Sequence, residues 1–290
     1  MTQRVAVPGA GGHTGGFVVA ELRRRGLEPV PCPRGTDLDE AFRQVDAVIN
    51  CAGPFAATAG PAIGAAVRAG LPYLDVTAEI EVVTETFAGH RDAPIPIVPA
   101  AAFFGGLADL LATTVFTPGT EKILIGYALS SWHPTPGTRA TGRVSAQRRA
   151  GRRIAYRDGG LRVLGSGDAP RTEWTFPSGT RPVVGEFTTA DSATIPTHLA
   201  VREVATFMTV NAVDDLIAGR AREHDESFLV EVVAGERRAV ARGRDIYAIT
   251  APLCVEAAVR ILAGEGAAPG VASLGARFDA RDFLDAMPLE

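Results

Sequence analysis

Lysine is almost absent from this chain of 290 residues: Lys122 is the only one, and every other basic residue is arginine. A Tyr-x-x-x-Lys catalytic pair therefore cannot form at any tyrosine, and a Schiff-base lysine or a phosphate-loop GK[ST] motif is almost excluded. Cysteine is scarce as well. Cys32, Cys51 and Cys254 lie far apart without C-x-x-C spacing, which predicts neither a disulfide framework nor a zinc site and fits a reducing compartment. No H-E-x-x-H motif occurs, so we expect no metal.

Long apolar runs and blocks of charge are also missing. No stretch is long enough to span a bilayer, and no basic arm is present. A net charge of -4 with 46% hydrophobic and 21% charged residues is typical of an ordinary globular protein rather than a nucleic-acid-binding one. The chain enters a strand-like segment within a few residues, without a signal-peptide pattern. We therefore expect a cytoplasmic protein that binds neither nucleic acid nor membrane.

The first third of the chain alternates short β-branched segments with helical stretches, several of which end in glycine. This is the pattern of βαβ units built around a parallel sheet. We expect strands near residues 5–7, 28–30, 46–51, 73–76 and 95–98. We expect helices over residues 14–25, 36–44, 61–69, 79–90 and 106–116.

The texture changes after residue 122, where strand-like runs are broken by proline, glycine and threonine as far as about residue 210. The tail is helical again over residues 247–263 and 279–287. The predicted fold class is α/β, with a Rossmann-type doubly wound parallel sheet and a second, mainly antiparallel α+β substrate domain. We expect the nucleotide domain over 1–118, completed by 247–290, and a substrate and dimerisation domain over 119–246.

A glycine-rich turn follows the first predicted strand and opens the first predicted helix. Gly9, Gly12 and Gly15 form a GxxGxxG pattern, with Gly11 and Gly16 adding freedom. Glycines let the backbone approach a pyrophosphate closely and direct the free amides of a helix N-terminus at the anion. A turn without a ligand is the alternative, but the strand–turn–helix context favours a dinucleotide. The predicted contacts here are Gly9, Gly11, Gly12, His13, Thr14 and Gly15.

The position that selects between NAD and NADP lies about twenty residues further on. An acidic side chain there binds the ribose 2′-hydroxyl of NAD, whereas an arginine accommodates the 2′-phosphate of NADP. Residues 30–35 contain no acid and one arginine, Arg34. Arg34 could instead be a solvated loop charge; we favour NADP as the cofactor.

Three segments resemble the saccharopine dehydrogenase-like NADP-binding family, which includes saccharopine reductases and trans-acting enoyl reductases: VPGAGGHTGGFVVAELRRRG, VINCAGPFAATAGPAIGAAVRAGLPYLDVTAE and IVPAA. FDARDFL near the C-terminus resembles the closing helix of that family. The resemblance implies NADPH-dependent reduction of a C=N, C=C or C=O bond in a small biosynthetic intermediate. It also implies that the loop after the third strand lies beside the ribose and nicotinamide, which adds Asn50, Cys51, Ala52, Gly53, Pro54 and Phe55 to the cofactor site.

The chain departs from this family at one place. Where relatives have a Gly-Phe-Asp-Ser turn followed by Pro-Ser-Asp, this sequence has AFFGGLAD at 102–109, without the first carboxylate or the serine. A non-catalytic NADP-sensing or scaffold protein therefore stays an alternative, as does an isomerase or epimerase that uses bound NADP transiently. No compact arginine cluster is visible, so saccharopine is not the expected substrate. The expected partner is a small molecule, and a homodimer is left open.

Catalytic candidates are few. Asp75, His133 and Tyr156 are the predicted proton-transfer residues, because a carboxyl, an imidazole or a phenol can each protonate a reduced product. For Asp75 and Glu79, capping of the following helix is an equal alternative, and His133 and Tyr156 can be structural or surface residues. The predicted substrate contacts are Thr77, Glu79, Phe103 and Phe104.

Overall fold

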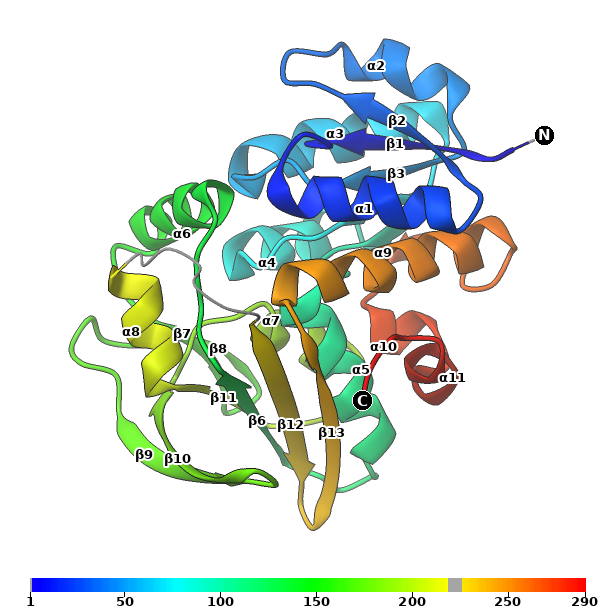
Figure 1. Cartoon of the computed structure of the whole chain (residues 1–290). Helices are drawn as coiled ribbons and strands as arrows, with labels where there is room; N and C mark the ends of the chain where they lie inside the picture. Colours follow the sequence, from blue (N-terminus) through cyan, green and yellow to red (C-terminus); the bar gives the residue numbers. More distant parts are fainter. Residues whose placement is uncertain (1, 219–225) are drawn as a thin grey trace.

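A computed structural model of the protein describes residues 2–218 and 226–290 and shows two sheets, with helices packed around and between them (Figure 1). The first sheet is six-stranded and parallel, in the order β14-β5-β4-β3-β1-β2. Its strands are β1 (Arg4–Pro8), β2 (Glu28–Cys32), β3 (Ala47–Asn50), β4 (Tyr73–Asp75), β5 (Pro96–Val98) and β14 (Gly270–Val271). Because the chain crosses over between β2 and β3, the ends of β1 and β3 form the switch point at which open α/β sheets bind ligands.

Helices cover both faces of this sheet. Val5 and Val7 face a core made with α1 (His13–Arg24) and α9 (Ile246–Leu262), whereas Ala6 faces the opposite core under α3 (Phe55–Ala69). This alternation follows from the two-residue period of a strand. Further helices are α2 (Leu38–Ala41), α4 (Ile80–Gly89), α10 (Leu274–Arg277) and α11 (Ala280–Asp285). The predicted Rossmann-type doubly wound sheet is confirmed.

The second sheet is eight-stranded and runs β13-β12-β6-β11-β10-β9, with β7 and β8 attached beside β11. Among its described strand pairs only β6 and β11 are parallel, so the prediction of a mainly antiparallel sheet is confirmed. The strands are β6 (Lys122–Leu129), β7 (Ile154–Arg157), β8 (Gly160–Val163), β9 (Arg171–Phe176), β10 (Gly179–Gly185), β11 (Glu203–Thr209), β12 (Ser227–Ala234) and β13 (Arg237–Arg244). The helices of this half are α5 (Ala108–Val115), α6 (Pro136–Arg148), α7 (Asp191–Thr194) and α8 (Val210–Ala218).

Helix α6 lies in a region where the sequence predicted strand-like runs, so that expectation was wrong. Pro136 occupies the first turn of the helix, where a missing N–H costs nothing. The Thr135 side chain accepts a hydrogen bond from the Thr138 N–H at 3.1 Å and caps the helix. The Thr-Pro-Gly sequence that suggested a chain break therefore starts a helix instead.

Helix α3 begins at Phe55, six residues before the predicted start. Its first turn carries no cap from its own segment. The carboxylate of Glu79, from the other side of β4, accepts the N–H groups of Phe55 at 2.7 Å and Ala56 at 3.3 Å. A negative charge at a helix N-terminus stabilises the helix, so a residue distant in sequence sets where α3 begins.

One hydrophobic core joins the two halves of the molecule. It includes Val7 and Leu74 from the first sheet, Leu110 of α5 between the sheets, and Ile125 and Val230 from the second sheet. Helix α9 packs on α1, and β14 adds the sixth strand, so the C-terminal part of the chain returns to the first sheet. The cleft described below therefore has walls anchored in one shared core.

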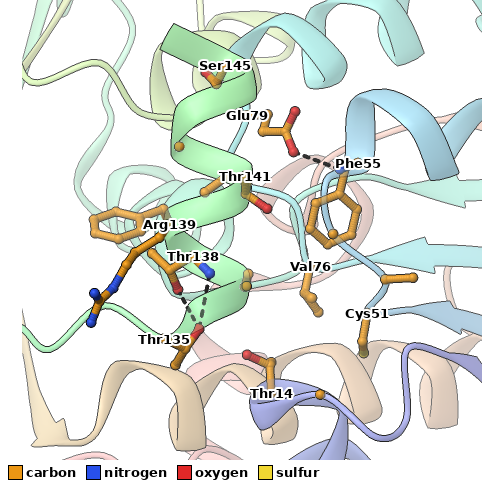
Figure 2. A pocket seen from close by; sticks show the side chains of 18 of the residues that line it. Thr14, Cys51, Phe55, Val76, Glu79, Thr135, Thr138, Arg139, Thr141 and Ser145 are labelled. Carbon is orange, nitrogen blue, oxygen red and sulfur yellow. Dashed lines mark hydrogen bonds between the residues drawn. The ribbon is translucent and has the colours of Figure 1, made fainter. Parts of the chain in front are cut away.

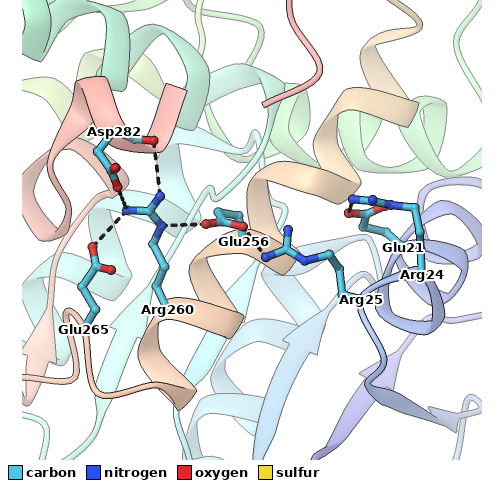
Figure 3. A network of polar contacts seen from close by, with 7 residues as sticks. All are labelled: Glu21, Arg24, Arg25, Glu256, Arg260, Glu265 and Asp282. Atoms are coloured by element: carbon cyan, nitrogen blue, oxygen red, sulfur yellow. Dashed lines mark hydrogen bonds and ion pairs between the residues drawn. The ribbon is translucent and has the colours of Figure 1, made fainter. Parts of the chain in front are cut away.

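A buried ionic network fixes α9 to its neighbours (Figure 3). The Arg260 guanidinium contacts Glu256 at 2.7 Å, Glu265 at 3.0 Å and Asp282 of α11 at 2.5 Å, and Arg25 at the end of α1 contacts Glu256 at 2.6 Å. Burial disfavours the charged form of Glu256, but the hydrogen bonds from Arg260 and Arg25 outweigh it and lower its pKa. The network ties together helices from both ends of the chain.

Replacing Glu256 with glutamine should lower the free energy of unfolding by about 2 kcal/mol at neutral pH, because two arginines lose their shared buried carboxylate. Since the pKa of Glu256 is lowered in the folded state, its contribution is present above the ordinary glutamate pKa and is lost as the pH falls through the lowered value. The difference between wild type and Glu256→Gln in urea denaturation should thus shrink in acid. The control is Glu40→Gln, whose ion pair with Arg43 is exposed and should contribute less than about 1 kcal/mol. Equal effects of the two substitutions would contradict the assignment.

Candidate functional site

A cleft of about 1920 Å³ lies between the first sheet and the second half of the molecule. Most small-molecule sites occupy about 300–1,000 Å³, so this cleft has room for a dinucleotide and a second molecule. The turns that follow β1, β2 and β3 form one wall. The predicted cofactor residues that line it are Gly9, Gly11, Gly12, His13, Thr14, Arg34, Asn50, Cys51, Ala52, Gly53 and Phe55. Gly15 and Pro54 are not part of the lining.

The glycine-rich turn is shaped by two close approaches of the backbone. Gly9 has a φ of +80°, and a Cβ there would lie 2.6 Å from the backbone of Cys51 and Ala52. A Cβ on Gly15 would lie 2.1 Å from the Gly9 carbonyl oxygen. Helix α1 starts directly after this turn, with no side-chain cap and no acidic residue in its first turn. Its free N–H groups and positive dipole end are therefore available to an anion.

The loop after β3 is held from below by polar side chains. Asn50 donates from Nδ2 to the Tyr73 hydroxyl at 3.1 Å, and its Oδ1 accepts the Ala52 N–H at 3.0 Å. Thr58 hydrogen-bonds to the Ala52 carbonyl. Asn50, at the start of this loop, is fully buried. The loop thus presents backbone and small side chains to the cleft in a fixed conformation.

Arg34 occupies the turn after β2 and is solvent-exposed while lining the cleft. Gly35, with a φ of +89°, and Thr36, whose hydroxyl donates to the Pro33 carbonyl at 2.7 Å, shape this turn. Thr36 also lines the cleft. The turn thus carries a cation, a hydroxyl and no acid.

The second half of the molecule covers the loop after β3 with α6, as Figure 2 shows. Thr138, Thr141 and Ser145 of α6 line the cleft opposite Phe55 and Glu79. A Cβ on Gly53 would meet the Thr141 hydroxyl at 2.6 Å, so the helix and the loop are in close contact. The sequence did not predict this helix, and nothing in its polar, threonine-rich pattern identifies its partner.

Asp75 lies beneath the cleft wall rather than in it. Its carboxylate is fully buried and accepts hydrogen bonds from the Ala100 N–H at 2.9 Å, the Thr77 N–H at 3.1 Å and the Tyr73 hydroxyl at 3.1 Å. Burial raises its pKa to about 6, although these hydrogen bonds oppose the shift. Asp75 fastens the end of β4 to the segment after β5, and it does not line the cleft.

His133 and Tyr156 are also outside the described lining of the cleft. His133 Nδ1 lies 2.6 Å from Oε1 of the buried Glu226 carboxylate, which is its hydrogen-bond partner. Tyr156 lies on β7, opposite Val204 of β11, and is half-buried against the core. His133 is thus bound to Glu226 and Tyr156 packs against the core, and their catalytic roles stay predictions.

The predicted substrate residues divide into two groups. Thr77 is buried and accepts the Glu79 N–H at 3.1 Å, and it does not line the cleft. Glu79 reaches the cleft, but both carboxylate oxygens bind the start of α3 rather than the start of α4. Burial raises the Glu79 pKa, while the two N–H groups lower it. Phe103 and Phe104 both line the cleft and lie against aromatic residues of the second half.

Phe104 is positioned by a turn whose backbone is bound by the second half. The turn η2 (Phe103–Leu107) follows β5, and the Gly105 N–H donates to Asp191 at 2.8 Å. Asp191 also accepts the Tyr127 hydroxyl at 2.7 Å and is fully buried, which raises its pKa. Asp191, in the second half of the molecule, therefore holds the backbone of η2 in place. No local pattern predicts this pairing, because Gly105 and Asp191 are more than eighty residues apart in the chain.

Tyr247, at the start of α9, is a cleft residue that the sequence argument did not select. Its hydroxyl accepts hydrogen bonds from Trp132 Nε1 at 3.2 Å and from the Thr138 hydroxyl at 3.0 Å. The ring of His13, in the glycine-rich turn, meets the Tyr247 ring edge-on at 5.2 Å between centroids. Burial raises the pKa of the phenol, so it is protonated at neutral pH. Helix α9, near the C-terminus, thus places the Tyr247 phenol beside the glycine-rich turn.

Within the described residues, no helix is both long and apolar enough to cross a bilayer. Over the same part of the chain, no three or more His, Cys, Asp or Glu side chains are grouped so as to hold a metal ion.

Comparison with known proteins identifies the fold. No protein-family model matches the chain. No curated protein matches it by sequence. Among solved structures, the apo saccharopine dehydrogenase (L-Glu forming) of Saccharomyces cerevisiae has a TM-score of 0.61, over 97% of this chain and 96% of that one, at 9% identity. An engineered D-amino acid dehydrogenase bound to NADP+ has a TM-score of 0.47, over 94% and 93% of the two chains, at 14% identity.

The DAP dehydrogenase of C. glutamicum in complex with DAP also has a TM-score of 0.47, over 98% and 99% of the two chains, at 13% identity. At such low identity the yeast structure shows the fold alone. The chain has a saccharopine dehydrogenase-like fold, as the sequence resemblance predicted.

The turn geometry makes a direct prediction for two neighbouring glycines of α1. Gly15→Ala should lower the free energy of unfolding by about 1–3 kcal/mol, because its Cβ would overlap the Gly9 carbonyl and move the turn. Gly16→Ala is the matched control, since nothing lies within 4 Å of its Cβ and alanine favours a helix. Thermal denaturation of the three proteins compares them. A Gly15→Ala protein as stable as Gly16→Ala would show that the turn is not as tight as described.

Proposed function

We propose that this protein is an NADPH-dependent reductase. Two features support the proposal: the turns after β1, β2 and β3 line one wall of the cleft, and the Tyr247 phenol and several aromatic side chains line the same cleft. The tight turn that Gly9 and Gly15 permit leads directly into the uncapped start of α1, whose first N–H groups have no side-chain partner and fit a pyrophosphate. NADPH, when bound, supplies a hydride to the carbon of a C=N, C=C or C=O bond, and the other atom of that bond takes a proton.

The choice of NADPH over NADH rests on the turn after β2. Arg34 is exposed there, and residues 30–35 contain no acidic side chain. Rossmann folds bind the adenosine ribose at this position. A guanidinium binds phosphate through charge-assisted hydrogen bonds that a ribose hydroxyl cannot replace. We therefore propose that the 2′-phosphate of NADPH binds at Arg34.

Arg34→Ala should weaken NADPH binding by about tenfold or more and leave NADH binding within about twofold, because only the phosphate contact is lost. Dissociation constants from titration of the nucleotide fluorescence measure both effects. Arg43→Ala is the control, since Arg43 lies on the same segment, pairs with Glu40 and does not line the cleft. Unchanged NADPH affinity in Arg34→Ala would remove the basis for the NADP assignment.

Net oxidation of NADPH tests the reaction itself. A panel of imines, enones and ketones, assayed for loss of NADPH absorbance, should include at least one compound that the protein reduces. A non-catalytic NADP-binding protein would oxidise no NADPH, and an isomerase using bound NADP would convert substrate without net oxidation. Nucleotide binding without turnover over a broad panel would therefore support one of these alternatives.

We further propose Tyr247 as the proton donor. It lines the cleft, whereas Asp75, His133 and Tyr156 do not. Both acceptor positions of its hydroxyl are taken by Trp132 and Thr138, so its own hydrogen is left to donate. The same two donors would stabilise the phenolate that forms when this proton is transferred. Its ring lies against His13 of the nucleotide turn, which puts it close to where a dinucleotide would lie.

Tyr247→Phe should lower kcat by about a hundredfold or more with the best substrate of the panel, because the phenol proton is lost while the ring remains. NADPH affinity should stay within about threefold. Tyr156→Phe is the matched control and should leave kcat unchanged, since Tyr156 does not line the cleft. A Tyr247→Phe protein with wild-type kcat, or a large loss in Tyr156→Phe, would refute the choice.

A further inference from the structure

Three aromatic side chains from separate elements meet in the cleft beside Tyr247. Phe104 comes from η2, Trp132 follows β6, and Phe187 follows β10. The ring centroids lie 5.5 Å apart for Phe104 and Trp132, 6.1 Å for Trp132 and Phe187, and 6.5 Å for Phe104 and Phe187. These separations are those of interacting aromatic rings, so the three form one surface. We call this surface, with the α8 residues described next, the aromatic chamber.

Helix α8 extends this surface with aliphatic side chains. Val213, Leu216 and Ile217 line the same cleft, and Ile217 is 79% exposed. The polar residues of the helix lie elsewhere: the Asp215 carboxylate accepts the Trp132 N–H at 3.3 Å and helps to hold the tryptophan. Apolar side chains that stay open to a cleft are a mark of a ligand site, because a protein otherwise buries them.

Two of the arginines that line the cleft near the chamber already bind protein carboxylates. Arg153 donates to Glu186 at 2.9 Å and to the Gly167 carbonyl, and Arg157 also binds Glu186. Arg149 contacts Ser145 at 2.6 Å and Glu81 at 3.5 Å. A substrate carboxylate would have to compete with these protein carboxylates for the same guanidinium groups.

We infer that the aromatic chamber takes an uncharged substrate with an apolar body of ring size, whose reducible bond lies toward Tyr247. The aromatic and aliphatic walls bind the body by apolar burial, and the phenol is the polar group that orients the reactive end. The chemistry of this substrate rests on the proposed reductase function, but its binding does not. The chain would then share the fold of saccharopine dehydrogenase without a site built for an amino-dicarboxylate.

Two ketones that differ by one carboxylate test the inference on the wild-type protein. The neutral probe is cyclohexyl phenyl ketone, and its partner is the same ketone with a para-carboxylate on the phenyl ring. Calorimetric titration with saturating NADP+, which cannot reduce either ketone, gives the dissociation constants. The neutral ketone should bind at least about tenfold more tightly. Equal or tighter binding of the carboxylate, or no binding of the neutral ketone, would overturn the inference.

Two substitutions locate the binding. Phe187→Ala should weaken the neutral ketone about tenfold, and Ile217→Gln about threefold, with NADP+ affinity unchanged. Ile217 is so exposed that its substitution keeps the fold, which the circular dichroism spectrum checks. Val163→Gln is the control, because Val163 is 56% exposed on β8 but does not line the cleft. Wild-type ketone affinity in both chamber variants would overturn the placement.

The cofactor measurement separates the two proposals. If the protein binds the neutral ketone, and loses it in Phe187→Ala, but binds neither NADPH nor NADP+, the chamber stands and the reductase function falls. If it binds NADPH but prefers the carboxylated ketone, the reductase function stands and the substrate class proposed here falls.

Discussion

The contact between the turn after β1 and the loop after β3 is the constraint on which the site depends. These two backbones approach so closely at Gly9 and Ala52 that no side chain fits between them. Because β1 and β3 are neighbours at the switch point of the sheet, their carboxyl ends open together into the cleft. Asn50, Tyr73 and Asp75 hold the loop side of this contact through buried hydrogen bonds. The cleft wall is therefore built from backbone, with its polar support behind it.

The half built on the first sheet could be predicted from sequence because its signals are local. The glycines, the β-branched strands and Arg34 lie within short segments whose order determines a βαβ unit, and most of these predicted cofactor residues line the cleft. Helix boundaries were less predictable where the cap comes from elsewhere, as Glu79 shows at the start of α3. The assigned domain limits and a homodimer stay predictions.

The positions of the catalytic candidates could not be predicted in the same way, because a residue type does not reveal which side of a wall it occupies. Asp75 ends a strand at the correct edge, yet its carboxylate points to the backbone of Thr77 and Ala100. His133 satisfies a buried glutamate. Tyr247 is separated from His13 by most of the chain, and only the return of α9 onto α1 brings them together. Such pairings depend on tertiary packing, which no periodicity encodes.

The shared core determines how this protein can be divided. Its two halves are joined by α9, which contacts β3 and β4 of the first sheet and β13 of the second, and by α5, which packs on β12, β13 and η2. A fragment that ended after the glycine-rich half would leave the faces of β1, β3 and α1 without the helix that covers them. The halves therefore depend on each other for folding, and a hybrid that joined this substrate half to another nucleotide domain would need α9 to be exchanged with the N-terminal segment.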